Sequence, residues 1–127
     1  MSIDAAMPVL VVDSYRTMTR IVRDLLGQLG FLIVDEANSA GQALDRLKTR
    51  EYALVISDTN LEPVTGHDLL KTMRDNPNLA KTRFIMMSAD ANSEILSSAK
   101  NAGADNYIFK PFDARMLKGK IEATLAA

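Results

Sequence analysis

Tyr52-Ala-Leu-Val-Ile-Ser-Asp58 is the stretch that indicates the fold most directly. It is short, almost wholly apolar up to its final acid, and does not alternate between apolar and polar residues. Continuous apolar runs of this length are typical of strands that are buried on both faces of a parallel sheet. The sequence therefore predicts a buried parallel strand here, with a carboxylate at its carboxyl end.

Four further apolar runs precede and follow this one along the chain. They span Pro8–Asp13, Phe31–Asp35, Arg83–Ser88 and Asn106–Lys110. Between the runs, apolar residues recur at helical spacing, as at Ile21, Leu25 and Leu29. Five strands that alternate with five helices predict an α/β fold, in which right-handed crossovers place helices on both faces of a parallel sheet.

Length and composition exclude several classes of protein. The chain has 127 residues, 47% of them hydrophobic, with 15 Lys and Arg against 16 Asp and Glu, and it has no Cys. A formal charge of -1 does not suit an electrostatic nucleic-acid binder, and the lack of Cys excludes thiol catalysis, disulfides and Cys-based zinc sites. No run approaches the roughly 20 apolar residues of a membrane span, and the polar start is not a signal peptide. We expect one cytoplasmic domain over residues 1–127, without membrane insertion.

The predicted strands end in residues that together suit phosphoryl chemistry. Asp13 ends the first run and Asp58 the third, while Ser88 and Lys110 end the fourth and fifth. Ligands of parallel sheets bind at these carboxyl ends. Two neighbouring carboxylates favour a cation between them, and oxygen ligands alone suit Mg²⁺. With a lysine for an anion and a carboxylate as nucleophile, an aspartyl phosphate can form.

Each of these residues alone has an ordinary structural explanation. An Asp at a strand end is usually a turn or capping residue, and a lysine such as Lys110 is usually solvated. Only their joint placement at four strand ends favours a functional site.

The ends of the runs carry an ordered set of motifs within about Val9 to Leu125. They are Val-Val-Asp13, Ile-Ser-Asp58-Thr-Asn60, Met-Met-Ser88-Ala89, Gly103-Ala104 and Lys110-Pro111-Phe112. With them the sequence resembles the receiver domain of two-component response regulators, and most of all the single-domain, chemotaxis-type CheY-like proteins. The resemblance implies a flavodoxin-like (βα)5 fold with strand order 2-1-3-4-5, a single receiver domain and no enzyme activity.

The resemblance also implies a role for each residue of the phosphorylation site. Asp58 matches the phosphoacceptor, and Lys110 matches the phosphate-binding lysine, whose bond to the following proline is cis in the family. Asp13 and Asp58 match acids of a Mg²⁺ site, to which Asn60 lends its main-chain carbonyl.

Two further positions match the switch of the family. Ser88 matches the hydroxyl that follows the phosphoryl group, and Tyr107 matches the aromatic residue whose rotamer reports activation. The implied partners are a histidine kinase of the CheA type and a protein target, which would bind the face formed by the fourth helix, fifth strand and fifth helix.

One departure concerns the metal. The family has an acidic pair after the first strand, where this sequence reads Asp13-Ser14. We therefore expect weak Mg²⁺ binding. Ser14 is either a helix N-cap in a site that no longer needs metal, or a ligand through its hydroxyl or a water molecule. Glu62 either reaches the metal and replaces the lost charge or is a solvated loop acid.

These alternatives leave more than one function open. The leading interpretation is a signalling switch that is controlled by phosphorylation of Asp58. The alternatives are a pseudo-receiver that binds partners without phosphorylation and a phosphate sink. A flavodoxin-like redox or nucleotide enzyme is disfavoured, because no glycine-rich phosphate loop follows the first strand.

Overall fold

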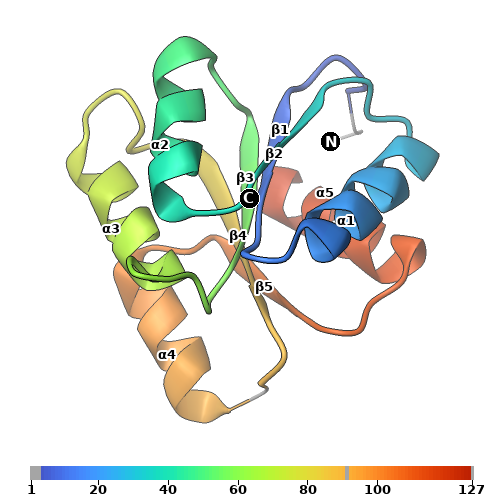
Figure 1. The fold of residues 1–127 in the computed structure, drawn as a ribbon. Helices are drawn as coiled ribbons and strands as arrows, with labels where there is room; N and C mark the ends of the chain where they lie inside the picture. Colours follow the sequence, from blue (N-terminus) through green and yellow to red (C-terminus); the bar gives the residue numbers. More distant parts are fainter. Residues whose placement is uncertain (1–3, 91, 127) are drawn as a thin grey trace.

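Strands and helices alternate strictly along the chain (Figure 1). The structure is a computed structural model, and it describes residues 4–90 and 92–126 except for the side chain of residue 93. The elements are β1 (Val9–Val12), α1 (Arg16–Gln28), β2 (Val34–Ala37), α2 (Ala40–Thr49), β3 (Leu54–Asp58), α3 (Gly66–Asp75), β4 (Arg83–Ser88), α4 (Ser93–Ala102), β5 (Asn106–Phe109) and α5 (Ala114–Ala126).

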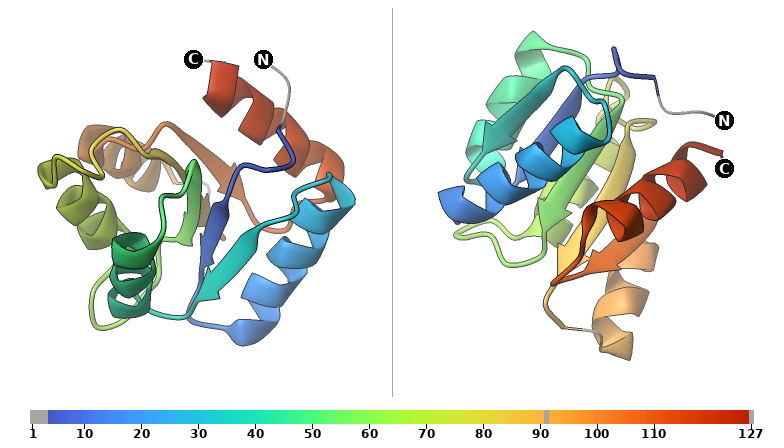
Figure 2. Two further views of the ribbon diagram at one scale, coloured as in Figure 1. Left: turned by 90° about the horizontal axis from the view of Figure 1, so that it is seen from above. Right: turned by 90° about the vertical axis from the view of Figure 1, so that its right-hand side faces the viewer.

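All five strands form one parallel sheet in the order β2-β1-β3-β4-β5. Helices α1 and α5 cover one face, and α2, α3 and α4 cover the other (Figures 1 and 2). The predicted α/β class, the strand order and the helices on both faces are confirmed. Strand β3 lies at the centre of the sheet, which places the residues at its end in the middle of the carboxyl edge.

Burial on both faces explains why β3 has no polar alternation. Leu54 and Ile56 belong to the core cluster that includes α1 and α5, whereas Val55 belongs to the cluster on the opposite face. All five residues of the strand are buried. Successive side chains of a strand point to opposite faces, so both sets must be apolar when each face is covered by helices.

The second strand differs from its prediction. The apolar run Phe31–Asp35 predicts a strand over those residues, but β2 begins at Val34 and continues to Ala37. Phe31 is buried in the core, and its N–H donates to the carbonyl of Leu26 at the end of α1. The run therefore combines a core residue from the helix-to-strand connection with the first part of a strand. The register that pairs Val34 with Val9 decides where β2 begins.

A glycine lets the start of α3 fold back onto the end of β3. The N–H of Gly66 donates to the carbonyl of Thr59 at 3.1 Å. A Cβ at residue 66 would lie only 2.2 Å from the main-chain oxygen of Asp58. The connection after β3 therefore has room for a hydrogen atom and not for a methyl group at this position.

We expect Gly66→Ala to destabilise the fold by about 1–3 kcal/mol, because the added methyl group must push apart two main-chain segments. Gly27→Ala is the matched control: Gly27 is exposed in the last turn of α1, and a Cβ there meets nothing within 4 Å. This change should stabilise the protein by up to about 1 kcal/mol. Urea unfolding measures both, and equal stability of the two variants would contradict the close approach.

Candidate functional site

Two acids lie side by side at the carboxyl edge of the sheet. Asp58 is the last residue of β3, and Asp13 directly follows β1, which pairs with β3 so that Val12 lies opposite Ser57. The side chain of Asp13 is completely buried, and Asp58 is only 4% exposed. The predicted juxtaposition of these carboxylates is therefore present, and both are largely removed from water.

One lysine bridges the two acids. The Nζ atom of Lys110 lies 2.9 Å from Oδ2 of Asp13 and 3.2 Å from Oδ1 of Asp58. The N–H of Lys110 donates to the carbonyl of Ser88 at 2.8 Å, which fixes the main chain just after β5. The Lys110–Pro111 peptide bond is cis, as the family resemblance predicts. Lys110 thus reaches across the sheet edge and places its positive charge between the carboxylates.

Burial and neighbouring charges shift the pKa values within this triad. Burial raises the pKa of Asp58, and the charge of Asp13 adds to the rise, while the Lys110 ammonium opposes it without cancelling it. For Lys110, burial alone would lower the pKa, but the hydrogen bond to Asp13 and the charge of Asp58 outweigh burial and raise it. The lysine is therefore firmly protonated, and the buried negative charge of Asp58 is only partly compensated.

Ser14 hydrogen-bonds to the loop that follows the phosphoacceptor position. Its hydroxyl donates to the main-chain carbonyl of Asn60 at 3.4 Å. The alternative in which Ser14 is a helix N-cap is wrong, because the N-cap of α1 is Tyr15 and makes no capping bond with its side chain. The N–H of Tyr15 instead donates to Oδ1 of Asp13 at 3.0 Å. Ser14 therefore touches the group that the resemblance assigns to the metal.

The two predicted switch residues lie outside the triad. Ser88 is buried, and its hydroxyl donates to the carbonyl of Asp90 and accepts from the Asp90 N–H, both at 3.0 Å. The ring of Tyr107 is partly buried, 5.7 Å from the ring of Phe109, and Nζ of Lys120 lies 5.2 Å from its centroid. Within the described part of the chain, neither side chain hydrogen-bonds to Asp58, so their switch roles stay predictions.

A cavity of about 550 Å³ opens onto Asp58. Its lining residues are Ser14, Tyr15, Asp58, Asn60, Glu62, Ala89 and Lys110. Ala89 belongs to the Met-Met-Ser88-Ala89 motif quoted from the sequence, whereas Tyr15 was not predicted as a site residue, although its place just after β1 could have suggested it. The cavity therefore leaves Asp58 and Lys110 within reach of a small group that enters from solvent.

Asn38 is a further residue that sequence reasoning missed. Its side-chain amide donates to the main-chain carbonyl of Asp13 at 3.0 Å, and its own N–H donates to the side chain of Gln42 in α2. The connection between β2 and α2 thereby holds the end of β1. No spacing pattern predicts a hydrogen bond of this kind between two loops.

The available oxygen atoms fit Mg²⁺ in kind. Two adjacent carboxylates and the carbonyl of Asn60 are hard ligands of the type that Mg²⁺ prefers. Within residues 4–90 and 92–126, however, no three His, Cys, Asp or Glu side chains form a group that could hold a metal ion. Glu62 lines the cavity but does not complete such a group with Asp13 and Asp58.

The sequence is similar to a known domain family and to individual chemotaxis proteins. Residues 9–122 match the response regulator receiver domain. The chain is 37% identical to chemotaxis protein CheY of Pseudomonas aeruginosa over 116 residues, which are 91% of this chain and 94% of that protein. It is 40% identical to chemotaxis protein CheY-3 of Vibrio cholerae over 116 residues, 91% of this chain and 89% of that protein.

Solved structures agree in fold. A putative response regulator from Chloroflexus aurantiacus superposes with a TM-score of 0.90 at 25% identity, covering 96% of this chain and 99% of that one. None of the helices in the described part of the chain is long and apolar enough to span a membrane.

The raised pKa of Asp58 predicts a stability effect that depends on pH. The folded protein binds this proton more tightly than the unfolded chain, whose pKa is near 3.8, so Asp58 lowers stability increasingly as the pH rises above 3.8, and the loss is complete once the pH exceeds its folded pKa. Asp58→Asn should therefore raise the melting temperature at pH 7 by several degrees. The gain should fade as the pH falls toward 3.8, where Asp58 is protonated in both states.

Asp45→Asn serves as the control, because Asp45 is an exposed acid of α2 that should change stability little at any pH. Calorimetry at a series of pH values measures both variants. A melting temperature for Asp58→Asn that is lower than wild type at pH 7 would show that Lys110 fully compensates the buried charge.

Proposed function

The chain belongs to the response regulator receiver domain family, and on this premise we propose that it is a switch that accepts a phosphoryl group on Asp58 from a histidine kinase. Receiver domains are signalling switches and generally not enzymes, and those of the CheY type interact with histidine kinases and downstream targets. The observation that carries the proposal is the triad: two buried carboxylates that share one lysine at the floor of an open cavity.

Phosphoryl transfer follows from the chemistry of the triad. A carboxylate oxygen of Asp58 attacks the phosphorus of a phosphohistidine, a P–O bond forms, and the P–N bond breaks. The imidazole nitrogen leaves with the electron pair and is then protonated, so the product on Asp58 is an aspartyl phosphate. Lys110 faces the transferred group and offsets the charge of its oxygens.

The neutral Ser14 would weaken the binding of Mg²⁺ at this site. Asp13, Asp58 and the main-chain carbonyl of Asn60 would hold Mg²⁺, which when bound supplies positive charge against the phosphoryl oxygens. An acid at residue 14 would add a negative charge beside these ligands, whereas the Ser14 hydroxyl is neutral and bonds to the same carbonyl. We therefore propose weak Mg²⁺ binding.

The signal would pass through Ser88. Its hydroxyl now bonds to Asp90, and a phosphoryl oxygen on Asp58 would compete for that hydroxyl. Release of the segment around Asp90 would shift α4 and allow Tyr107 to change its rotamer, because a bound group biases an equilibrium by its preference for one state.

The proposed partners follow the same logic. The kinase would be of the CheA type, and the output would be a protein that reads the face of α4, β5 and α5, with all of this taking place in the cytoplasm. The near-neutral charge gives no support for nucleic-acid binding.

The intact Asp58–Lys110–Asp13 triad does not favour a pseudo-receiver. A phosphate sink would use the same chemistry without the output partner.

Incubation with acetyl phosphate and Mg²⁺ should add the mass of one phosphoryl group to the wild-type protein. Asp58→Asn should show no gain, because an amide is not a nucleophile for this step, whereas Asp45→Asn should gain the mass normally. Intact-protein mass spectrometry gives the answer. The proposal fails if the wild type gains nothing or if Asp58→Asn gains the same mass.

Ser14→Asp should tighten Mg²⁺ binding by about tenfold or more, because the added carboxylate attracts the cation. A tenfold change in affinity corresponds to about 1.4 kcal/mol. Glu62→Ala should change the affinity less than about threefold, as expected for an exposed loop acid. Isothermal titration with Mg²⁺ compares the variants. Unchanged affinity in Ser14→Asp would refute the charge argument, and a marked loss in Glu62→Ala would identify Glu62 as the replacement acid.

A further inference from the structure

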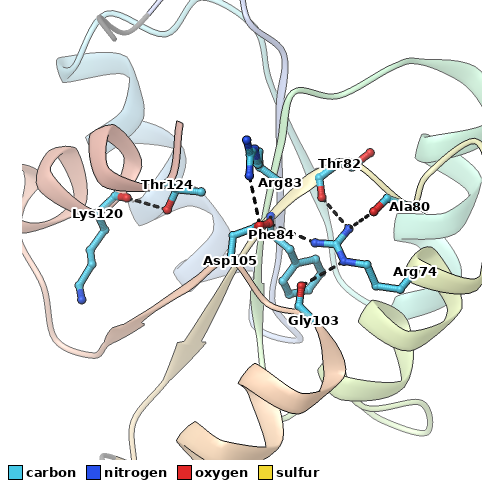
Figure 3. Close-up of polar contacts among 9 residues, drawn as sticks. All are labelled: Arg74, Ala80, Thr82, Arg83, Phe84, Gly103, Asp105, Lys120 and Thr124. Carbon is cyan, nitrogen blue, oxygen red and sulfur yellow. Dashed lines mark hydrogen bonds and ion pairs between the residues drawn. The ribbon is translucent and has the colours of Figure 1, made fainter. Parts of the chain in front are cut away.

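Arg74 joins three segments by hydrogen bonds (Figure 3). They lie at the amino edge of the sheet, before β4 and β5 begin, whereas Asp58 lies at the carboxyl edge. From the last turn of α3, the Nε of Arg74 donates to the carbonyl of Gly103 at 3.0 Å. Its Nη1 donates to the carbonyls of Ala80 at 3.1 Å and Thr82 at 2.7 Å, and its Nη2 donates to Oδ2 of Asp105 at 3.1 Å. One guanidinium therefore holds the end of α3, the connection to β4 and the connection from α4 to β5.

The C-terminal end of α4 is shaped to receive this guanidinium. Gly103 is the C-cap of α4 and has a φ of +100°, which favours glycine. A Cβ at this residue would lie 3.2 Å from both Cγ and Nε of Arg74. Asp105 in turn accepts the N–H of Phe84 at 2.8 Å, which attaches the same segment to the start of β4. This end of α4 is therefore bound to two other elements by specific polar contacts.

The N-terminal end of α4 is held differently. The side chain of Asn92 accepts from the N–H groups of Glu94 and Ile95, which belong to the helix itself. The preceding bonds between Ser88 and Asp90 are also local. These bonds stabilise the start of the helix without attaching it to α3.

Burial also differs between the two halves of α4. Among the described side chains of α4, only Ala99 is buried, and it lies in the second half of the helix. In the first half, the apolar residues Ile95 and Leu96 are only partly buried, so the apolar anchorage of this half is incomplete.

We propose that Arg74 is the fixed point about which α4 turns when Asp58 is phosphorylated. This inference rests on the proposed function, because the displacement begins when Ser88 releases Asp90. The start of α4 moves with that segment, while Gly103 and Asp105 stay in place on Arg74. Four acceptors around one planar group require a guanidinium, so a lysine cannot replace it.

Hydrogen exchange tests the anchoring in the absence of any ligand. Arg74→Lys keeps the positive charge but loses the planar guanidinium that donates to four acceptors. The main-chain amides of residues 101–106 should therefore exchange hydrogen about tenfold faster than in wild type. Arg83→Lys is the matched control, because Arg83 contacts the same Asp105 carboxylate at 3.4 Å but not Gly103. It should change exchange at 101–106 by less than about threefold. Exchange in β1 and β3 serves as the reference for global unfolding.

Beryllofluoride with Mg²⁺, which mimics a phosphoryl group on a carboxylate, tests the pivot. In wild type it should change exchange over residues 94–98 and leave 101–106 as before. In Arg74→Lys the change should extend through 101–106. Equal exchange of Arg74→Lys and wild type at 101–106 without ligand would overturn the anchoring, and a wild-type change of the same size at both ends of α4 would overturn the pivot.

Failure of the proposed function has a separate signature. If wild-type protein gains no phosphoryl mass and shows no response to beryllofluoride, the switch is refuted and the pivot with it. The comparison of Arg74→Lys with Arg83→Lys without ligand still decides whether Arg74 anchors α4.

Discussion

The rest of the site depends on the burial of two like charges next to each other. Asp13 and Asp58 are taken out of water at adjacent strand ends, and burial together with the charge of Asp13 raises the pKa of Asp58. Lys110 is the counter-charge that makes this arrangement tenable. Removing Lys110 would leave two uncompensated buried carboxylates, whereas removing Asp58 leaves Asp13 and Lys110 as a balanced pair, so the lysine is the member on which the other two depend. The strand order provides the geometry, because it brings β1 next to β3 and leaves Lys110 within reach from β5.

Sequence reasoning was most successful where the fold itself enforces a pattern. A strand covered by helices on both faces must be apolar throughout, so β3 could be recognised, and with it the positions of Asp58 and Asp13 at the sheet edge. It was least successful where a polar side chain meets distant main chain. The bonds from Asn38 to Asp13 and from Arg74 to Gly103 join residues far apart in the chain and leave no periodic signal. The start of β2 was misplaced because pairing with β1, rather than hydrophobicity, decides it.

Ser14 changes the balance of charge at the site more than its geometry. With Asp13, Asp58 and Lys110 ionised, the triad carries one net negative charge, and an acid at residue 14 would double it. With the neutral hydroxyl bonded to Asn60, the protein's own lysine balances one of the two negative charges. A site of this kind depends less on a metal ion for its own stability, and the proposed phosphoryl group would then be the main new charge to be accommodated.

The placement of β1 between β2 and β3 has a consequence for the order in which the protein is made. Synthesis releases the chain from its N-terminus, so β1 and β2 are available before β3, and β5 comes last. Asp13 and Asp58 are therefore both synthesised before Lys110. A domain of this size generally folds as one cooperative unit, so the two acids enter a folded sheet edge only when the lysine is also present. The last strand thus leads to the positive charge without which the edge formed by the earlier strands would stay unbalanced.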